Sequence, residues 1–225
     1  ITPDGVETVY GLETTTGNYV VWGIASSNSG QYQQSPVPRG GAIIQEDYWK
    51  LWEDDKYPPF EYILASLDCA YTEKEENDPS ALTIWGIFRD ENKNARVMLI
   101  HAWEERLEFR ALLELVEVSC TKTKLPTDHP LAHKPSFPVD RLIIEAKASG
   151  LSVAQEMHSQ FSLSGRFGVE VITPKGDKVV RVHSIQHLFA DGLIYAPDKS
   201  WATKVINQCG IFPKGAHDDL VDSTS

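Results

Sequence analysis

The chain has 225 residues, of which 41% are hydrophobic and 24% are charged, a composition that suits a globular protein with a sizeable core. Its formal net charge of −11 argues against a protein that binds nucleic acid through general positive charge, so any contact with DNA requires local lysines and arginines or a metal ion in an acidic site. The three cysteines show no CxxC spacing, which argues against a disulfide framework or a zinc ribbon, and no run is long enough to cross a bilayer.

The first part of the chain differs in character from the rest. The sequence begins at Ile1 without an initiator methionine, and we interpret it as part of a longer protein. Residues 1–58 contain short β-prone runs divided by Gly, Ser, Asn and Pro, and residues 31–41 (QYQQSPVPRGG) are expected to form an irregular connector. We therefore predict an N-terminal extension or linker over residues 1–58 and one domain over residues 59–225.

Strands and helices are expected to alternate beyond that boundary. Residues 62–71 form a mostly apolar run that is typical of a central buried strand. The β-rich runs 81–89 and 95–103 follow it and are joined by a polar turn, so the three consecutive strands are predicted to form an antiparallel meander. Residues 104–118 carry apolar side chains at helical spacing. The later elements are predicted as strand 139–146, helix 151–161, strand 168–173, helix 178–189, strand 193–195, helix 200–209 and a last helix at the acidic motif 217–222.

This order predicts an α/β fold, a mixed β-sheet flanked by helices. Two of its expected strands contain or end at a carboxylate. Asp68 lies within an apolar run, where a charge is costly unless it is paired or bound to a metal ion. Glu145 follows the apolar residues 142–144 and precedes a glycine turn. The alternatives are a strand-end Asp68 that faces solvent and a Glu145 that pairs with Lys147.

The acidic motif His217-Asp218-Asp219-Leu220-Val221-Asp222 is the third signal. Three carboxylates within five residues repel one another unless a cation lies among them. On a helix, Asp218 or Asp219 lies about one turn before Asp222, so two carboxylates share a face. The alternative is that the aspartates cap a helix. His217 is either a ligand or proton carrier, or simply exposed.

Two strand carboxylates and an acidic helix that converge on one point would supply enough oxygen ligands for two divalent ions roughly 4 Å apart, an arrangement used for in-line displacement at phosphodiesters. No serine or cysteine nucleophile with a histidine base competes with this interpretation. Basic residues for DNA contact are expected at Lys175, Lys178 and Arg181, where the last two lie at i, i+3 on one side of a helix. The alternative is a solvated helix face. Lys147 could hold phosphate, position water or pair with Glu145.

Four parts of the sequence carry a family resemblance. They are Leu67-Asp68 with residues 80–86 (SALTIWG), residues 144–150 (IEAKASG), residues 188–197 (LFADGLIYAP) and residues 215–223 (GAHDDLVDS). Together they resemble the nuclease domain of the large terminase subunit of tailed bacteriophages, a ribonuclease H-like fold. The connector at residues 32–36, with Gly40-Gly41, is also similar to the segment that joins the ATPase and nuclease domains of such proteins.

The resemblance implies a divalent-metal-dependent endonuclease that cuts concatemeric double-stranded phage DNA during genome packaging, with Mg²⁺ or Mn²⁺ as cofactor and two ions expected. The catalytic residues would be Asp68, Glu145, Asp219 and Asp222, and the same four residues with Asp218 would be the metal ligands. In the full-length context the partners would be the terminase small subunit and the portal protein, in the cytoplasm of the infected host cell.

The sequence also departs from such a protein, because no GxxxxGK[ST] phosphate loop is present and the ATP-driven motor is therefore not in this chain. Two other functions stay open. One is a resolvase, integrase or transposase of the same fold group, and the other is a non-catalytic module that docks to DNA or to a portal.

Overall fold

The computed structural model describes residues 41–54, 56–69, 79–121, 135–145, 154–159, 167–174, 176–215 and 218–225, together with the backbone of 18–21 and 24–27. Three residues singled out from the sequence, Lys147, Lys175 and His217, lie outside this description, as does nearly all of the predicted connector 31–41.

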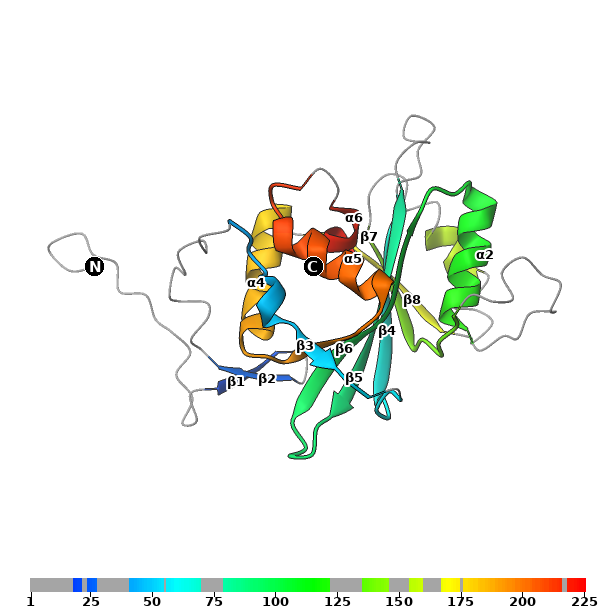
Figure 1. Cartoon of the computed structure of the whole chain (residues 1–225). Helices are drawn as coiled ribbons and strands as arrows, with labels where there is room; N and C mark the ends of the chain where they lie inside the picture. The colour runs from blue at the N-terminus through cyan, green and yellow to red at the C-terminus, as the bar shows by residue number, and fades with distance from the viewer. Residues whose placement is uncertain are drawn as a thin grey trace, which may run out of the picture.

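The centre of the molecule is a seven-stranded mixed sheet with the order β3-β9-β6-β5-β4-β7-β8 (Figure 1). A separate antiparallel pair is formed by β1 (Asn18–Val21) and β2 (Ile24–Ser27). The strands of the main sheet are β3 (Lys50–Trp52), β4 (Tyr62–Asp68), β5 (Ser80–Arg89), β6 (Ala95–Glu105), β7 (Arg141–Glu145), β8 (Gly168–Ile172) and β9 (Ile194–Pro197).

Strand direction decides where the carboxylates lie. Strands β4, β5 and β6 form an antiparallel meander, as predicted. Outside the meander every pairing in this sheet is parallel: β4 with β7, β7 with β8, β6 with β9, and β9 with β3. Strand β5 therefore runs against the other six strands, whose carboxyl ends share one edge of the sheet. Ligand sites of open α/β sheets commonly form at such an edge.

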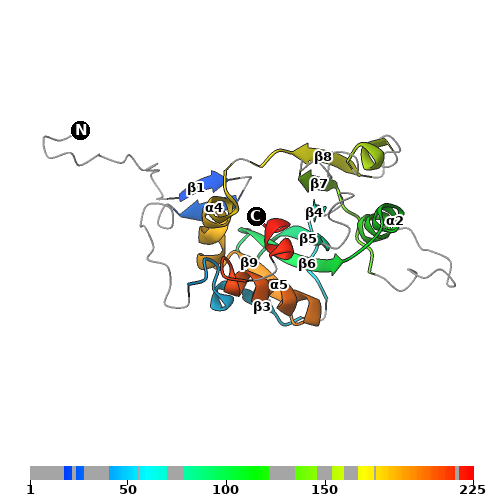
Figure 2. The same cartoon turned by 90° about the horizontal axis from the view of Figure 1, so that it is seen from above.

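Helices cover both faces of the sheet, which confirms the predicted α/β class. Helix α2 lies against one face, and α4, α5 and α6 lie against the other (Figures 1 and 2). None of the described helices is long and apolar enough to cross a membrane. The helical elements are η1 (Glu46–Tyr48), α2 (Phe109–Cys120), a short helical segment within 154–159, α4 (Lys178–Ala190), α5 (Ser200–Ile211) and α6 (Asp219–Asp222).

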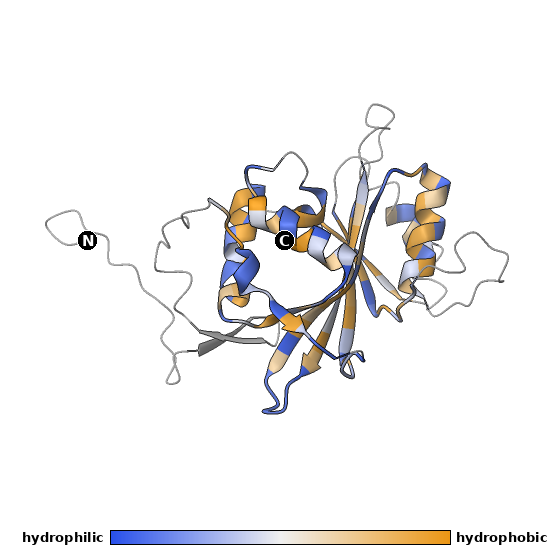
Figure 3. Ribbon diagram, in the orientation of Figure 1, coloured by the Kyte–Doolittle hydropathy of each residue, from blue (hydrophilic) through white to orange (hydrophobic). Residues whose placement is uncertain are grey.

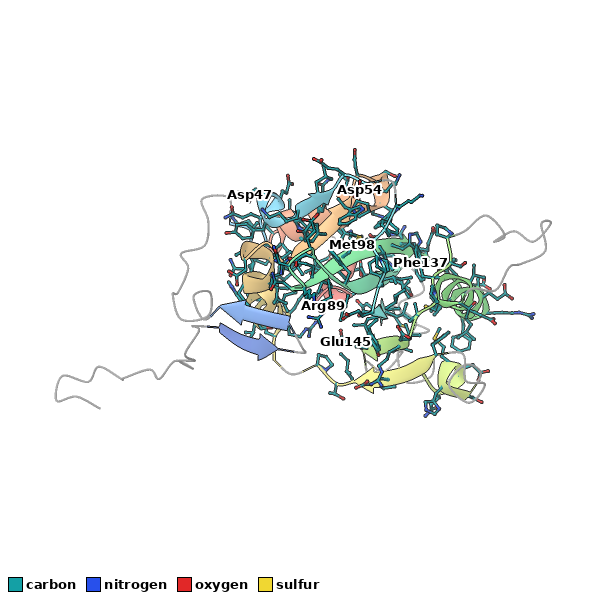
Figure 4. The ribbon with its side chains drawn as sticks, turned by 90° about the horizontal axis from the view of Figure 1, so that it is seen from below. Asp47, Asp54, Arg89, Met98, Phe137 and Glu145 are labelled. Atoms are coloured by element: carbon teal, nitrogen blue, oxygen red, sulfur yellow. The ribbon has the colours of Figure 1, made fainter. Side chains whose placement is uncertain are left out.

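The alternation of side chains along the strands produces two cores, one on each face of the sheet. Met98, which is fully buried in the middle of β6, packs in the core beneath α2 (Figure 4). Its neighbour Leu99 is equally buried but belongs to the core beneath α4, α5 and α6. Hydrophobic residues accordingly follow the strands through the centre, whereas the turn between β5 and β6 is hydrophilic (Figure 3).

Two of the differences from the predicted element boundaries change where carboxylates lie. Strand β4 ends at Asp68, so this carboxylate closes the strand and does not lie within it. Strand β6 continues through Glu105, because Glu104 and Glu105 pair with the first residues of β5, and α2 begins only at Phe109. The helix expected from residue 104 therefore starts five residues later.

Residues on the N-terminal side of Pro58 contribute to this domain. Strand β3 pairs with β9 at the sheet edge, and Ile43, Ile44 and Trp49 are buried in the core beneath α4 and α5. The division of the chain at residue 58 stays a prediction.

Candidate active site

A cavity of about 210 Å³ opens at the edge of the sheet where the six parallel strands end. Three carboxylate residues from distant parts of the chain line it: Asp68 of β4, Glu145 of β7 and Asp222 of α6. The guanidinium-bearing residue Arg181 of α4 lines the same cavity. The structure thus brings together three of the four carboxylates that the sequence singles out as catalytic.

Register and side-chain alternation explain why the two strand carboxylates meet. Leu67 and Ile144 are partners across the parallel β4–β7 pair, and both are buried in the core beneath α2. Because successive side chains point to opposite faces of a sheet, Asp68 and Glu145 both point to the face that carries α4 and α6. Glu145 lies at the end of β7 (Figure 4). Two neighbouring strands therefore deliver their carboxylates to the same side.

Helix α6 brings the third carboxylate over the sheet, where it lies beside β5 and β6 (Figure 2). Asp218 occupies the N-cap position, yet its side chain makes no capping hydrogen bond. The helix-cap interpretation of the acidic motif therefore does not account for Asp218. Asp222 is 7% exposed, and such a buried carboxylate requires compensation by cations or metal.

Two cations from α4 compensate this charge. Lys178 Nζ lies 2.5 Å from an Asp222 oxygen and 2.8 Å from an Asp218 oxygen. Arg181 Nη2 lies 3.0 Å from Asp222 and 3.7 Å from Glu145, so it bridges α6 and β7. Burial acts to lower the pKa of Lys178, but the hydrogen bonds to Asp218 and Asp222 outweigh it, and the pKa is raised.

The i, i+3 spacing of Lys178 and Arg181 does project both side chains to one side, as the sequence predicts. That side faces the acidic site, however, and the alternative of a solvated helix face is wrong for them. The Arg181 side chain is only 17% exposed and that of Lys178 25%. Whether they also contact DNA stays a prediction.

Asp219 and its neighbour Asp218 differ from the three carboxylates of the cavity. Neither is among the residues that line it, although Asp222 on the next turn is. Burial raises the pKa of Asp219, and the nearby charges of Glu104 and Asp218 raise it further. The charge of Glu104, at the end of β6, therefore acts on Asp219.

Sequence reasoning does not identify Glu104, because the apolar spacing of residues 104–118 predicts a helix there. In the structure it lies at the end of β6, with its side chain 10% exposed. Lys204 Nζ lies 3.1 Å from it, and the Gln208 amide donates a hydrogen bond to it at 2.8 Å. The available signal was the one that identified Glu145, namely a carboxylate that directly follows an apolar strand.

The donor set suits a hard divalent cation, because Asp68, Glu145 and Asp222 all offer carboxylate oxygens to one cavity. Within the described ranges, no three carboxylate, imidazole or thiol groups lie close enough together to ligate a single ion. Lys178 pairs with Asp222, and Arg181 pairs with both Asp222 and Glu145, so these cations now balance the negative charge of the site. The carboxylates fit a divalent ion by their chemistry, and such an ion would have to replace part of this positive charge.

One family of known proteins matches the C-terminal part of the chain, which contains Glu145, Arg181 and Asp222. Residues 128–225 match the family described as the terminase RNaseH-like domain, and this segment contains β7, β8, α4, β9, α5 and α6. No curated protein sequence matches the chain significantly.

Several solved structures are similar at low identity. The large terminase of a thermophilic bacteriophage is 13% identical over 75% of this chain and 36% of its own length, with a TM-score of 0.46. The large terminase nuclease of thermophilic phage G20c with bound zinc is 11% identical over 80% of this chain and 92% of that one, with a TM-score of 0.45. A manganese-soaked terminase nuclease domain of human cytomegalovirus is 15% identical over 80% and 82%, with a TM-score of 0.46. The chain spans about a third of the length of the first of these proteins.

Proposed function

Because residues 128–225 match the family of terminase RNase H-like domains, we propose that this chain is a divalent-metal-dependent endonuclease domain that cuts concatemeric double-stranded DNA during viral genome packaging. One observation carries the proposal. Asp68, Glu145 and Asp222, which come from β4, β7 and α6, line a single cavity although they are far apart in the sequence.

Asp68, Glu145 and Asp222 are the residues that would hold Mg²⁺ or Mn²⁺. The participation of Asp218, which pairs with Lys178 and is not among the residues that line the cavity, stays a prediction. When bound, such ions supply an activated water and stabilise the charge on the leaving oxygen. Two ions are expected, as the sequence predicts, because phosphodiester displacement develops charge on both the attacking and the leaving oxygen. The participation of Asp219 stays a prediction, since Asp219 is not among the residues that line the cavity.

Lys178 and Arg181 have two tasks in this proposal. Without a divalent ion they offset the repulsion among the carboxylates, through the ion pairs described above. In a site that holds a divalent ion, the Lys178 ammonium and the Arg181 guanidinium would be available for a DNA phosphate. Local cations of this kind are needed, because a formal net charge of −11 repels the substrate at longer range. Lys147 and Lys175 are proposed as further DNA contacts.

In the full-length protein the expected partners are the terminase small subunit and the portal protein, in the cytoplasm of an infected bacterium. The ATP-driven step of packaging would be supplied by sequence outside this chain.

The proposal is tested by plasmid nicking with Mn²⁺ or Mg²⁺. Asp68→Asn and Glu145→Gln each remove a charge from the cavity at nearly constant volume, and we expect each to lower the cleavage rate at least a hundredfold. The matched control is Glu170→Gln on β8, whose side chain is 45% exposed and pairs with Arg141 on the surface. It removes the same charge without altering the cavity.

Cleavage by the two cavity variants at the rate of the control would refute the assignment. Linear, supercoiled and branched substrates are compared in the same assay. A strong preference for branched DNA would favour a resolvase over a packaging nuclease. Folding of each variant is checked by circular dichroism, so that loss of rate is attributable to the site.

A further inference from the structure

We propose that Thr83 and Gln208 are positioning residues for Asp222. Their hydrogen bonds hold the two ends of helix α6 in place over the sheet. The inference rests on the proposed function in one respect, because Asp222 matters as a ligand only if the site binds metal. The attachment of α6 by these two hydrogen bonds is a property of the fold. Neither residue lines the cavity, and neither was singled out by any motif in the sequence.

Helix α6 requires external support because it consists of only four residues, Asp219–Asp222. An isolated helix of this length is unstable, since nucleation fixes several residues for each hydrogen bond gained. Its internal backbone bonds are few, and one of them runs from the Asp222 amide to the Asp218 carbonyl at 3.0 Å. The orientation of Asp222 therefore depends on tertiary contacts.

The first contact is made by Thr83, in the middle of β5 and fully buried. Its hydroxyl donates to the backbone carbonyl of Ser223 at 2.7 Å, immediately after Asp222 in the chain. The same hydroxyl accepts a hydrogen bond from the Trp85 indole at 2.9 Å. Because the indole occupies an acceptor site of the Thr83 oxygen, the hydroxyl proton is left to point toward Ser223. The C-terminal end of α6 is thus joined to the central strand of the sheet.

The second contact is made by Gln208 of α5, which is 8% exposed. Its side-chain oxygen accepts from the Leu220 amide at 3.1 Å, one of the amides at the start of α6 that have no partner within the helix. Its side-chain nitrogen donates to Glu104 at 2.8 Å. The N-terminal end of α6 is thus joined to α5 and to the end of β6.

These two hydrogen bonds hold the backbone at Leu220, two residues before Asp222, and at Ser223, the residue after it. Apolar burial adds to the attachment, since Leu220 is 1% and Val221 0% exposed, but it does not specify direction. Directional hydrogen bonds at Leu220 and Ser223 determine how α6 is turned, and hence which way the Asp222 carboxylate points. Loss of either hydrogen bond leaves a buried polar group without its partner, which favours a different orientation of the helix.

The test compares Thr83→Val, which keeps the shape but removes the hydroxyl, with Thr83→Ser, which keeps the hydroxyl. The structure offers a matched control in Ser119 of α2, which is 1% exposed. Its hydroxyl likewise accepts from an indole, that of Trp103, and donates to a backbone carbonyl, that of Leu115. Ser119→Ala therefore removes the same pattern of hydrogen bonds in the other core.

Two quantities are measured for each variant: amide hydrogen exchange of residues 219–224 and Mn²⁺ affinity by calorimetry. We expect Thr83→Val to speed exchange in this segment and to weaken Mn²⁺ binding, each at least tenfold. Thr83→Ser should stay within about threefold of the parent in both. Ser119→Ala should lower the melting temperature while leaving exchange at α6 and Mn²⁺ affinity unchanged.

Parent-like exchange at α6 in Thr83→Val would overturn the inference, and so would an equal loss of Mn²⁺ affinity in Ser119→Ala. Gln208→Met provides an independent variant and should resemble Thr83→Val. If the parent protein bound no Mn²⁺, the proposed function would fail, and the exchange measurements alone would still decide whether Thr83 and Gln208 hold α6.

Discussion

Replacement of Arg181 by methionine should tighten metal binding while it weakens the metal-free fold. The guanidinium lies 3.0 Å from Asp222 and 3.7 Å from Glu145, two carboxylates that the proposed function assigns to metal binding. It therefore competes with a divalent ion for the same negative charge. The methionine side chain would preserve much of the apolar stem and remove the competing cation.

The size of the effect follows from the burial of the three side chains, which are 17% exposed for Arg181, 11% for Glu145 and 5% for Asp222. At an effective dielectric constant of about 20, each pair attracts by roughly 4 kcal/mol before desolvation is counted. Desolvation offsets most of this attraction. Lys178 also stays in contact with Asp222. We therefore expect a net loss of about 2 kcal/mol in metal-free stability and a gain of about 1.4 kcal/mol, or tenfold, in Mn²⁺ affinity.

Calorimetry with Mn²⁺ at about 0.15 M salt measures the affinity, and thermal unfolding with a chelator measures the stability. Arg110→Met is the matched control, because the Arg110 side chain is 92% exposed and its removal changes the net charge equally. Mn²⁺ affinity of Arg181→Met at or below that of Arg110→Met would contradict competition between the guanidinium and the ion. It would mean that Arg181 organises the carboxylates for the ion and does not compete with it.

Three further predictions concern residues around the site and the core. In the presence of a chelator, Asp219→Asn should raise the melting temperature at pH 7, because burial and the charges of Glu104 and Asp218 raise the pKa of Asp219 and so penalise its ionised form in the folded state. The gain should shrink as pH falls through the folded pKa and vanish below about 4, where the aspartate is protonated in both states. Gly86→Ala should lower stability by about 1–3 kcal/mol in urea unfolding, since a Cβ there would clash with the Phe60 ring, and a parent-like midpoint would contradict this contact. The thiol of Cys209, whose pKa burial raises to about 12, should resist alkylation at pH 8 until the protein unfolds, and rapid labelling of the native protein would contradict its burial.

Most of the fold was predictable because its strands are long and apolar. The runs that predicted strands 81–89 and 95–103 correspond closely to β5 (Ser80–Arg89) and β6 (Ala95–Glu105), and their antiparallel pairing follows from the short polar turn. Strand β3 was not predicted. It has three residues and acquires its conformation only by pairing with β9, an interaction between segments more than a hundred residues apart.

The candidate site was predictable where a carboxylate interrupts an apolar pattern, as at Asp68 and Glu145. The side on which each aspartate of the acidic motif lies was not predictable, because α6 is too short for its own periodicity to determine its orientation. That orientation comes from Thr83 and Gln208, whose hydrogen bonds join it to distant elements. The ion pairs of Lys178 and Arg181 were likewise not predictable from the sequence, since a charged residue on a helix gives no indication of what packs against it.

The proposed function requires Asp68, Glu145 and Asp222 to form one metal site. A crystal structure of the protein soaked in Mn²⁺, with anomalous scattering used to locate the ions, tests this requirement. We expect anomalous density in the cavity, within about 2.5 Å of oxygens from these three residues, with Arg181 or Lys178 displaced from Asp222. Anomalous density at other carboxylates alone, in a protein that cleaves DNA with Mn²⁺, would contradict it.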